Sequence, residues 1–245
     1  MDVGALVARA AARFGDRVAV EGPERTLTFA ELGERVTRLG NGLRALGLQP
    51  GDRVLDLQAN STTYVETDLA IRAAGLVRVA LNYRLHPDDW ARIADDSGAV
   101  ALVMDHGFAE QATALREGMA HVVSIGDAPG RAYEQLIAEA PARPLPPVDP
   151  DSLCGLPYSS GTTGHPKGAQ RTHRNWLASV VNMTHDVLGG PPRPTDVYAH
   201  AGPITHTSGL FVLPFLVAGA KQLVMPAFDA GEFVDAVEHR GVTHV

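Results

Sequence analysis

The sequence contains one cysteine, Cys154, among its 245 residues. A single thiol cannot form a disulfide within the chain, and neither a second cysteine nor closely spaced histidines accompany it as zinc ligands. This shortage excludes a disulfide-stabilised secreted scaffold and gives no support for a zinc centre. A reducing, cytoplasmic setting is the interpretation that fits best.

The chain also lacks an excess of positive charge. It carries 21 Lys and Arg against 28 Asp and Glu, which gives a formal net charge of −7. A protein that neutralises a nucleic-acid backbone or an anionic membrane needs a broad basic surface, and this balance excludes one. We predict no nucleic-acid partner, although a small polyanion could still bind at one place.

Long hydrophobic runs are absent as well. The most apolar stretch, Gly209 to Ala220, contains Pro214 and is too short to span a bilayer. The first residues, Met1-Asp2, place an acid where a secretory signal would place positive charge. We therefore expect a cytoplasmic protein without an integral membrane segment.

The sequence does have the hydrophobic content of an ordinary globular protein, 45%. A helix is predicted to begin at Thr28, which forms a capping box with Glu31, and to end at Gly47. Strand and helix patterns then alternate, which indicates an α/β fold with mostly parallel sheets flanked by helices. The further strands are expected at 53–57, 76–81, 100–104 and 121–125, and the further helices at 63–74, at 87–96 and after His106.

Prolines concentrate between Pro141 and Pro150, where they favour extended backbone and stop any helix. We predict a boundary there between a first βα subdomain, residues 1–150, and a second, residues 151–245. In the second, the pattern predicts an entry strand at 153–157, a helix capped by Thr172 that runs to about Leu188, strands at 197–199 and 222–225, a helix at 228–240 and a strand beginning at 241–245.

A loop rich in glycine and hydroxyl groups lies near the start of the second subdomain. Residues Tyr158 to Gly168 contain four Ser and Thr hydroxyls, three glycines and Lys167. Glycine lets backbone N–H groups converge on phosphate oxygens, while hydroxyls donate and lysine adds positive charge. Each charge-assisted hydrogen bond is worth roughly 1.5–3 kcal/mol, so several together could hold a triphosphate.

Two better-known nucleotide loops fail on spacing. The P-loop of ATPases requires Gly-Lys followed by Ser or Thr at the start of a helix, whereas Lys167 is followed by Gly168 and preceded by Pro166. The dinucleotide fingerprint requires Gly-x-Gly-x-x-Gly, which this loop does not match. A plain surface loop is the remaining alternative, and the full string between a strand and an extended segment disfavours it.

The loop closely resembles the phosphate-loop signature of the adenylate-forming superfamily, which includes acyl-CoA synthetases, luciferases and peptide-synthetase adenylation domains. The resemblance covers essentially the whole chain and fits the N-terminal domain of such an enzyme, incomplete at its C-terminus. Besides the loop, it rests on Thr172-His173-Arg174-Asn175, Leu27-Thr28-Phe29-Ala30-Glu31-Leu32, Pro50-Gly51-Asp52-Arg53-Val54 and Leu81-Asn82-Tyr83-Arg84-Leu85.

This resemblance implies a two-step reaction. A carboxylic acid attacks the α-phosphate of ATP, and the resulting acyl-AMP passes to a thiol, usually that of coenzyme A. Magnesium is implied as a cofactor, although the chain offers no convincing carboxylate ligand for it. The residues implied to hold the β- and γ-phosphates and to stabilise the leaving pyrophosphate are Ser159, Ser160, Gly161, Thr162, Thr163, Gly164 and Lys167.

A second stretch, Gly202 to Gly209, is similar to the family's next motif. The resemblance assigns to His206 the role of orienting the acid's carboxylate and gating the pocket. An ordinary histidine at a helix start is the alternative, since the chain has ten histidines. The apolar residues 210–216 could wall an acyl pocket, but core packing explains most of them equally well, and Trp176 and Met183 have the same ambiguity.

The family's later motifs do not occur in the sequence. These motifs carry an adenine contact, a magnesium-linked Glu, a ribose-binding Asp and the catalytic lysine of a mobile C-terminal domain. We therefore expect an N-terminal fragment of an acyl- or aryl-CoA ligase that turns over little or not at all alone. Two alternatives stay open: an adenylating enzyme that loads a carrier protein or another nucleophile, and a non-catalytic shortened nucleotide-binding module.

Overall fold

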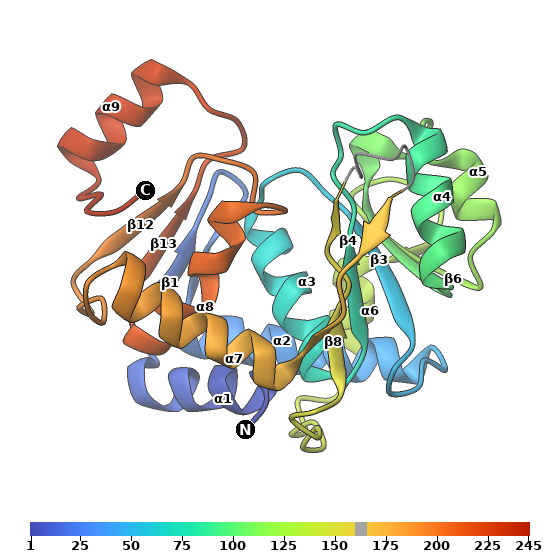
Figure 1. The fold of residues 1–245 in the computed structure, drawn as a ribbon, viewed down its shortest axis with the longest axis horizontal. Helices are drawn as coiled ribbons and strands as arrows, with labels where there is room; N and C mark the ends of the chain where they lie inside the picture. Colours follow the sequence, from blue (N-terminus) through green and yellow to red (C-terminus); the bar gives the residue numbers. More distant parts are fainter. Residues whose placement is uncertain (160–165) are drawn as a thin grey trace.

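A computed structural model describes residues 1–159 and 166–245 of the chain. Two large sheets stand side by side, and the helix α3 (Thr62–Ala73) lies between them (Figure 1). Sequence alternation predicted helices flanking mostly parallel sheets, and the structure confirms this arrangement.

The larger sheet has seven strands within the described residues, in the order β11-β8-β4-β3-β5-β6-β7. Neighbouring strands run parallel except β11, which is antiparallel to β8. The strands are β3 (Arg53–Leu57), β4 (Val77–Ala80), β5 (Ala101–Asp105), β6 (His121–Ile125), β7 (Arg131–Ala132), β8 (Leu153–Gly155) and β11 (Arg171–Thr172).

The second sheet has the order β12-β13-β1-β2 and joins segments that are far apart in the sequence. Strand β1 pairs in parallel with β13, so Val20 lies opposite Gln222. Near the chain end, a single parallel bridge joins His244 to Tyr198, at the place where a strand was expected to begin. The strands are β1 (Val18–Glu21), β2 (Thr26–Thr28), β12 (Val197–His200) and β13 (Lys221–Val224).

Helices cover the outer faces of the sheets and fill the space between them (Figure 1). Both predicted helix starts are confirmed, since Thr28 and Thr172 each form a capping box with the residue three positions later. These two helices are α2 (Phe29–Ala45) and α7 (His173–Asn182). The other α-helices besides α3 are α1 (Val3–Phe14), α4 (Pro87–Ser97), α5 (Thr113–Glu117), α6 (Tyr133–Glu139), α8 (Val212–Ala218) and α9 (Ala230–His239). Short helical segments of other types are η1 (His106–Phe108), η2 (Met183–Val187) and η3 (Thr207–Phe211).

The periodicity missed the first part of the fold, because it placed the first element at Thr28. Helix α1 and strand β1 lie before Thr28, and strand β2 ends at Thr28. Strands of three or four residues are too short to show an alternating pattern. The division into residues 1–150 and 151–245 stays a prediction, and each large sheet takes strands from both sides of the proline-rich segment.

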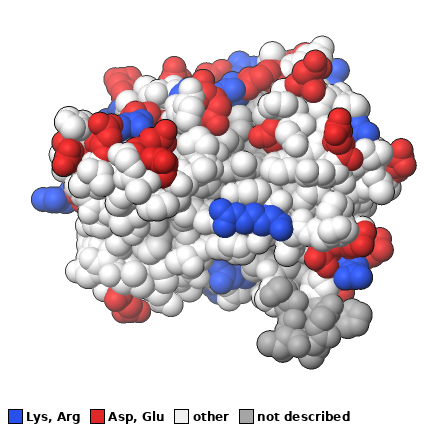
Figure 2. Space-filling model, turned by 90° about the horizontal axis from the view of Figure 1, so that it is seen from above, with Lys and Arg blue, Asp and Glu red and all other residues white. Residues whose placement is uncertain are grey.

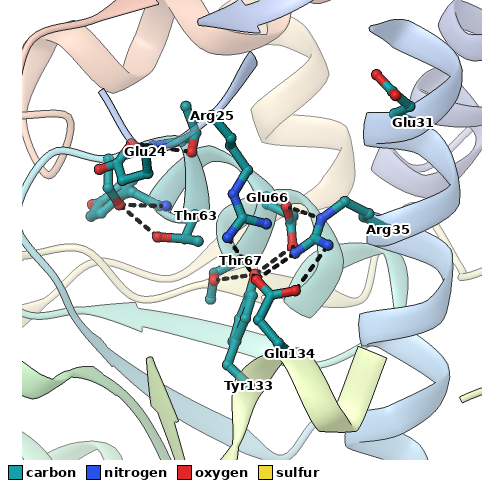
Figure 3. Close-up of polar contacts among 12 residues, drawn as sticks. Glu24, Arg25, Glu31, Arg35, Thr63, Glu66, Thr67, Tyr133 and Glu134 are labelled. Atoms are coloured by element: carbon teal, nitrogen blue, oxygen red, sulfur yellow. Dashed lines mark hydrogen bonds and ion pairs between the residues drawn. The ribbon is translucent and has the colours of Figure 1, made fainter. Parts of the chain in front are cut away.

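Helix α3 is buried along its whole length although it carries three charged residues, Glu66, Asp68 and Arg72. A buried charge is tolerated only with close partners. Glu66 receives hydrogen bonds from Arg35 of α2 at 2.8 and 3.0 Å and from the Tyr133 hydroxyl of α6 at 2.8 Å (Figure 3). This contact network ties three helices together.

The opposite side of α3 faces strands β3 and β4. Asp68 lies 2.8 Å from Arg72 and 2.7 Å from Arg78, and Arg78 also lies 2.6 Å from Asp56. Burial raises the pKa of Asp56 above its ordinary value, and the Arg78 charge opposes that rise. Arg78 therefore neutralises two buried carboxylates at once.

Replacing Arg78 with methionine leaves Asp56 and Asp68 without their shared cation. We expect R78M to lower the free energy of unfolding by about 3–5 kcal/mol, measured by equilibrium denaturation in urea. The matched control is R92M, because Arg92 forms only an exposed pair with Asp89. That control should change stability by at most about 1 kcal/mol, and equal losses in the two variants would contradict the assignment.

Candidate active site

Three polar residues follow the carboxyl ends of parallel strands in the two large sheets. Asn60 follows β3, Asn82 follows β4 and His206 follows β12. In open α/β sheets, ligands bind outside the carboxyl ends of the strands, so this placement favours a site there. The sheet topology brings these residues together although 146 positions separate the first from the last (60 to 206).

A cavity of about 290 Å³ lies between α3, β4, α7 and the segment after β12. Its wall includes His206, Asn82, Tyr158 and Trp176. The Trp176 ring lies under the guanidinium of Arg72, with 3.9 Å between the ring centroid and Cζ. The cavity therefore combines apolar surface with charged side chains, among them Arg72 and its ion-pair partner Asp68.

Asn60 holds the backbone of the segment that leads to His206. Its side-chain amide donates to the carbonyls of Gly202 at 2.8 Å and Met225 at 3.1 Å, and its carbonyl accepts from the Ile204 N–H at 2.9 Å. Asn60 itself is 6% exposed. Buried side-chain amides with this many partners fix the conformation of the backbone they contact.

The turn after His206 is equally constrained. A Cβ added at Gly209 would lie 2.1 Å from the Ile204 carbonyl oxygen, so only glycine fits. Ser208 lies 2.7 Å from Nδ1 of the fully buried His200, whose Nε2 lies 3.0 Å from Gln222. Burial lowers the pKa of His200 to about 4, and the hydrogen bond to Gln222 opposes this shift.

His206 is exposed at the edge of the cavity and meets Asn82. Its Nε2 lies 3.1 Å from Nδ2 of Asn82, across from one sheet to the other. The sequence singled out His206 but gave Asn82 no site role. The signal that could have identified Asn82 and Asn60 is their position shortly after parallel strands.

The base of the predicted phosphate loop is a β-hairpin. Strand β9 (Tyr158–Ser159) pairs antiparallel with β10 (Lys167–Gly168), so Lys167 lies opposite Ser159. Both residues are exposed, and neither belongs to the cavity wall. The other predicted phosphate ligands, Ser160, Gly161, Thr162, Thr163 and Gly164, lie outside the described residues.

Tyr158 connects this hairpin to the cavity. It lines the cavity, and its hydroxyl donates to Asp96 of α4 at 2.5 Å. Gly168 packs on the Tyr158 ring, and an added Cβ would lie 2.8 Å from the ring. The base of the hairpin and the His206 segment therefore converge on one cavity.

The apolar residues after His206 divide as the sequence suggested. Leu213, Phe215 and Leu216 are at most 2% exposed and belong to the hydrophobic core, whereas Leu210 lines the cavity. Met183 packs against a buried aromatic cluster rather than the cavity. Core packing accounts for most of this stretch.

The described residues do not fit a magnesium site. Within residues 1–159 and 166–245, no three His, Cys, Asp or Glu side chains gather closely enough to hold a metal ion. Divalent magnesium prefers oxygen ligands, chiefly carboxylates and water. No chemical step is therefore assigned to a metal on these residues.

The surface above the two sheets is weakly charged. Figure 2 shows acidic side chains gathered toward the edges of this face, with a middle that is largely uncharged apart from a small area of basic side chain. Across the part of the chain that the structure covers, no helix has the length and apolar character needed to cross a membrane. On this face, the residues that the structure describes form no broad basic patch of the kind that binds a polyanionic surface.

Buried His200 makes stability depend on pH in a predictable direction. Its pKa is about 4 in the folded chain and about 6.5 when unfolded, so the unfolded state binds more protons between these values. The contribution of neutral His200 to the free energy of unfolding is therefore complete above about pH 6.5. It falls by on the order of 3 kcal/mol as the pH is lowered to about 4. Urea denaturation across this range should show a shallower decline in H200Q than in the original chain.

His185 provides the control for this experiment because it is exposed. The H185Q variant should keep the decline of the original chain. A decline in H200Q as steep as that in H185Q would contradict a neutral, buried His200.

The sequence of the chain is similar to those of curated ligases. The chain is 40% identical to a feruloyl-CoA synthase of an Amycolatopsis species over 222 residues, which cover 89% of this chain and 43% of that protein. It is 30% identical to the fatty acid–[acyl-carrier-protein] ligase ScoC of Streptomyces coeruleorubidus, over 89% of this chain and 42% of that protein. The chain thus spans less than half the length of these curated relatives.

The fold of the chain is also similar to that of a solved structure. ATP-bound MatB from Rhodopseudomonas palustris superposes with a TM-score of 0.82 and 29% sequence identity, covering 98% of this chain and 48% of that one. The family model described as AMP-binding enzyme matches residues 7–245. The chain therefore belongs to the family of AMP-binding enzymes.

Proposed function

We propose that this chain forms the N-terminal part of an acid–thiol ligase that activates a carboxylic acid as its acyl adenylate and then transfers the acyl group to coenzyme A. The observation that carries the proposal is the convergence of the β9–β10 hairpin base and the His206 segment on one cavity, in a chain of the AMP-binding family. The buried single thiol Cys154 also fits a cytoplasmic setting.

The activation step requires the carboxylate of the acid to be aligned with the α-phosphate of ATP. A free carboxylate is a poor electrophile, and attack on the α-phosphate of ATP converts it to a mixed anhydride while pyrophosphate leaves. In this proposal His206 orients the carboxylate at the mouth of the cavity, and the acyl part enters beside Leu210 and Trp176. The fixed backbone around Asn60 and Gly209 holds His206 in place.

The hairpin supplies the phosphate end of the same arrangement. Lys167 and Ser159 lie opposite each other at its base, and the loop between them carries the remaining glycines and hydroxyls. We propose that Ser159, Ser160, Gly161, Thr162, Thr163, Gly164 and Lys167 bind the β- and γ-phosphates and stabilise the charge that develops on pyrophosphate. Magnesium would bind with ATP through groups outside the described residues.

Similarity to a feruloyl-CoA synthase supports coenzyme A as the acceptor for this chain. Similarity to the fatty acid–[acyl-carrier-protein] ligase ScoC supports an acyl carrier protein as the alternative. Both accept the acyl group on a thiol, so the adenylation half of the site does not distinguish them. We expect a protein that includes this chain and extends to the length of its relatives to convert at least one acid from a panel of carboxylic acids to a thioester. The acceptor should be either coenzyme A or an acyl carrier protein. No thioester with either acceptor would contradict the assignment as an acid–thiol ligase.

In that longer protein, K167A should raise the KM for ATP or lower the rate of ATP–pyrophosphate exchange by about 10–100-fold, since one charge-assisted bond is lost. The H206A variant should lower exchange by a similar factor through the acid substrate. The matched control for Lys167 is K221A, because Lys221 pairs with Glu21 outside the site. Exchange unchanged by K167A would contradict the phosphate role.

Residues 1–245 alone should show little or no acid-dependent ATP–pyrophosphate exchange, because the adenine pocket and the catalytic lysine belong to later motifs of the family. The measurement is exchange of labelled pyrophosphate into ATP with and without a panel of acids. Exchange comparable to that of the longer protein would overturn this prediction and favour a complete site within this chain. Binding of ATP without exchange would instead agree with it.

A further inference from the structure

We propose that Asn82 is a positioning residue that fixes the tautomer of His206, so that Nδ1–H of the imidazole faces the acid substrate. The inference rests on the proposed function for the identity of the acid, but the tautomer itself follows from hydrogen bonds of Asn82 in the structure. It concerns a residue that the motif around His206 does not contain.

The orientation of the Asn82 amide is determined by its neighbours. Its Oδ1 accepts a hydrogen bond from the backbone N–H of Arg84 at 3.0 Å, an interaction that the NH₂ group could not make. Its main-chain carbonyl accepts from Nε1 of Trp90 at 3.0 Å, and Trp90 is almost fully buried. The group that faces His206 is therefore the amide NH₂, a donor only.

This orientation decides which ring nitrogen of His206 carries the proton. The Asn82 NH₂ group lies 3.1 Å from Nε2, so Nε2 must accept and carry no hydrogen. In a neutral imidazole the hydrogen then sits on Nδ1. The two nitrogens point in different directions, which leaves Nδ1–H to donate away from Asn82.

The tautomer matters for the chemistry of the proposed reaction. A carboxylate that must attack phosphorus needs a donor that orients it without removing its charge. A neutral Nδ1–H meets this need, whereas the opposite tautomer would point a lone pair at the carboxylate and repel it. An Asn at position 82 therefore selects the form of His206 that receives the acid.

The contact also crosses between the two sheets. Asn82 follows β4 of the larger sheet, and His206 follows β12 of the smaller one. His206 is held from its own side by the Asn60 hydrogen bonds, so Asn82 fixes the ring and its protonation, not the backbone. If Asn82 contributed only to protein stability, replacing it would leave the tautomer of His206 unchanged.

The test uses the ¹⁵N-labelled chain of residues 1–245 at a pH where histidine is neutral. Two-bond ¹H–¹⁵N correlations report which ring nitrogen carries the hydrogen, and loss of one set in H206Q assigns the signal. We expect the Nδ1–H pattern in the original chain. In N82D, a carboxylate opposite Nε2 requires a hydrogen there, and the pattern should change to Nε2–H.

The matched control is N182D, because Asn182 is exposed at the end of α7. This variant should retain the original pattern. An Nε2–H pattern in the original chain would overturn the proposal, and so would an Nδ1–H pattern that N82D leaves unchanged.

A kinetic arm separates this inference from the proposed function. In the longer protein, N82D and H206Q should each lower acid-dependent exchange by about tenfold or more, and the double variant should lose little beyond either one. Full activity in N82D with the changed NMR pattern would overturn the role toward the acid. No exchange with any acid in the original longer protein would instead count against the proposed function, while the NMR result would still decide the tautomer.

Discussion

The burial of α3 between two sheets is the constraint on which the rest of the structure depends. Every residue of this helix is buried, yet Glu66, Asp68 and Arg72 bring charge into the interior. Their partners come from both sides: Arg35 and Tyr133 on one, and Arg78 on the other. Since an unpaired buried charge is costly, the two sheets and their helices can pack on α3 only in the arrangement that pairs these groups.

The same arrangement positions the candidate site. With α3 fixed, the carboxyl ends of β4 and β12 face each other, and the residues that follow them enclose one cavity with the hairpin base beside it. Asn60 and Asn82 then tie the two sheets together through the His206 segment. Short polar contacts at strand ends therefore hold the His206 segment next to the larger sheet.

Several features were predictable because their physical cause is local. The capping boxes at Thr28 and Thr172, the strand at 53–57 and the failure of the P-loop spacing depend only on residues close in sequence. Strands β1 and β2 were missed because they are short and β1 is stabilised by pairing with β13, which lies far along the chain. Trp176 could not be assigned, since its role depends on the guanidinium of Arg72 that lies over it.

The sequence by itself determined the α/β class, and it singled out the loop at 158–168 and His206 as candidates, because spacing and residue chemistry carry that information. Tertiary structure alone decided that Asn82 faces His206, that Asn60 holds the backbone before it and that Arg78 serves two carboxylates. These contacts join residues whose separation along the chain says nothing of their distance in space. Only the packing of both sheets on α3 brings them within reach of a hydrogen bond.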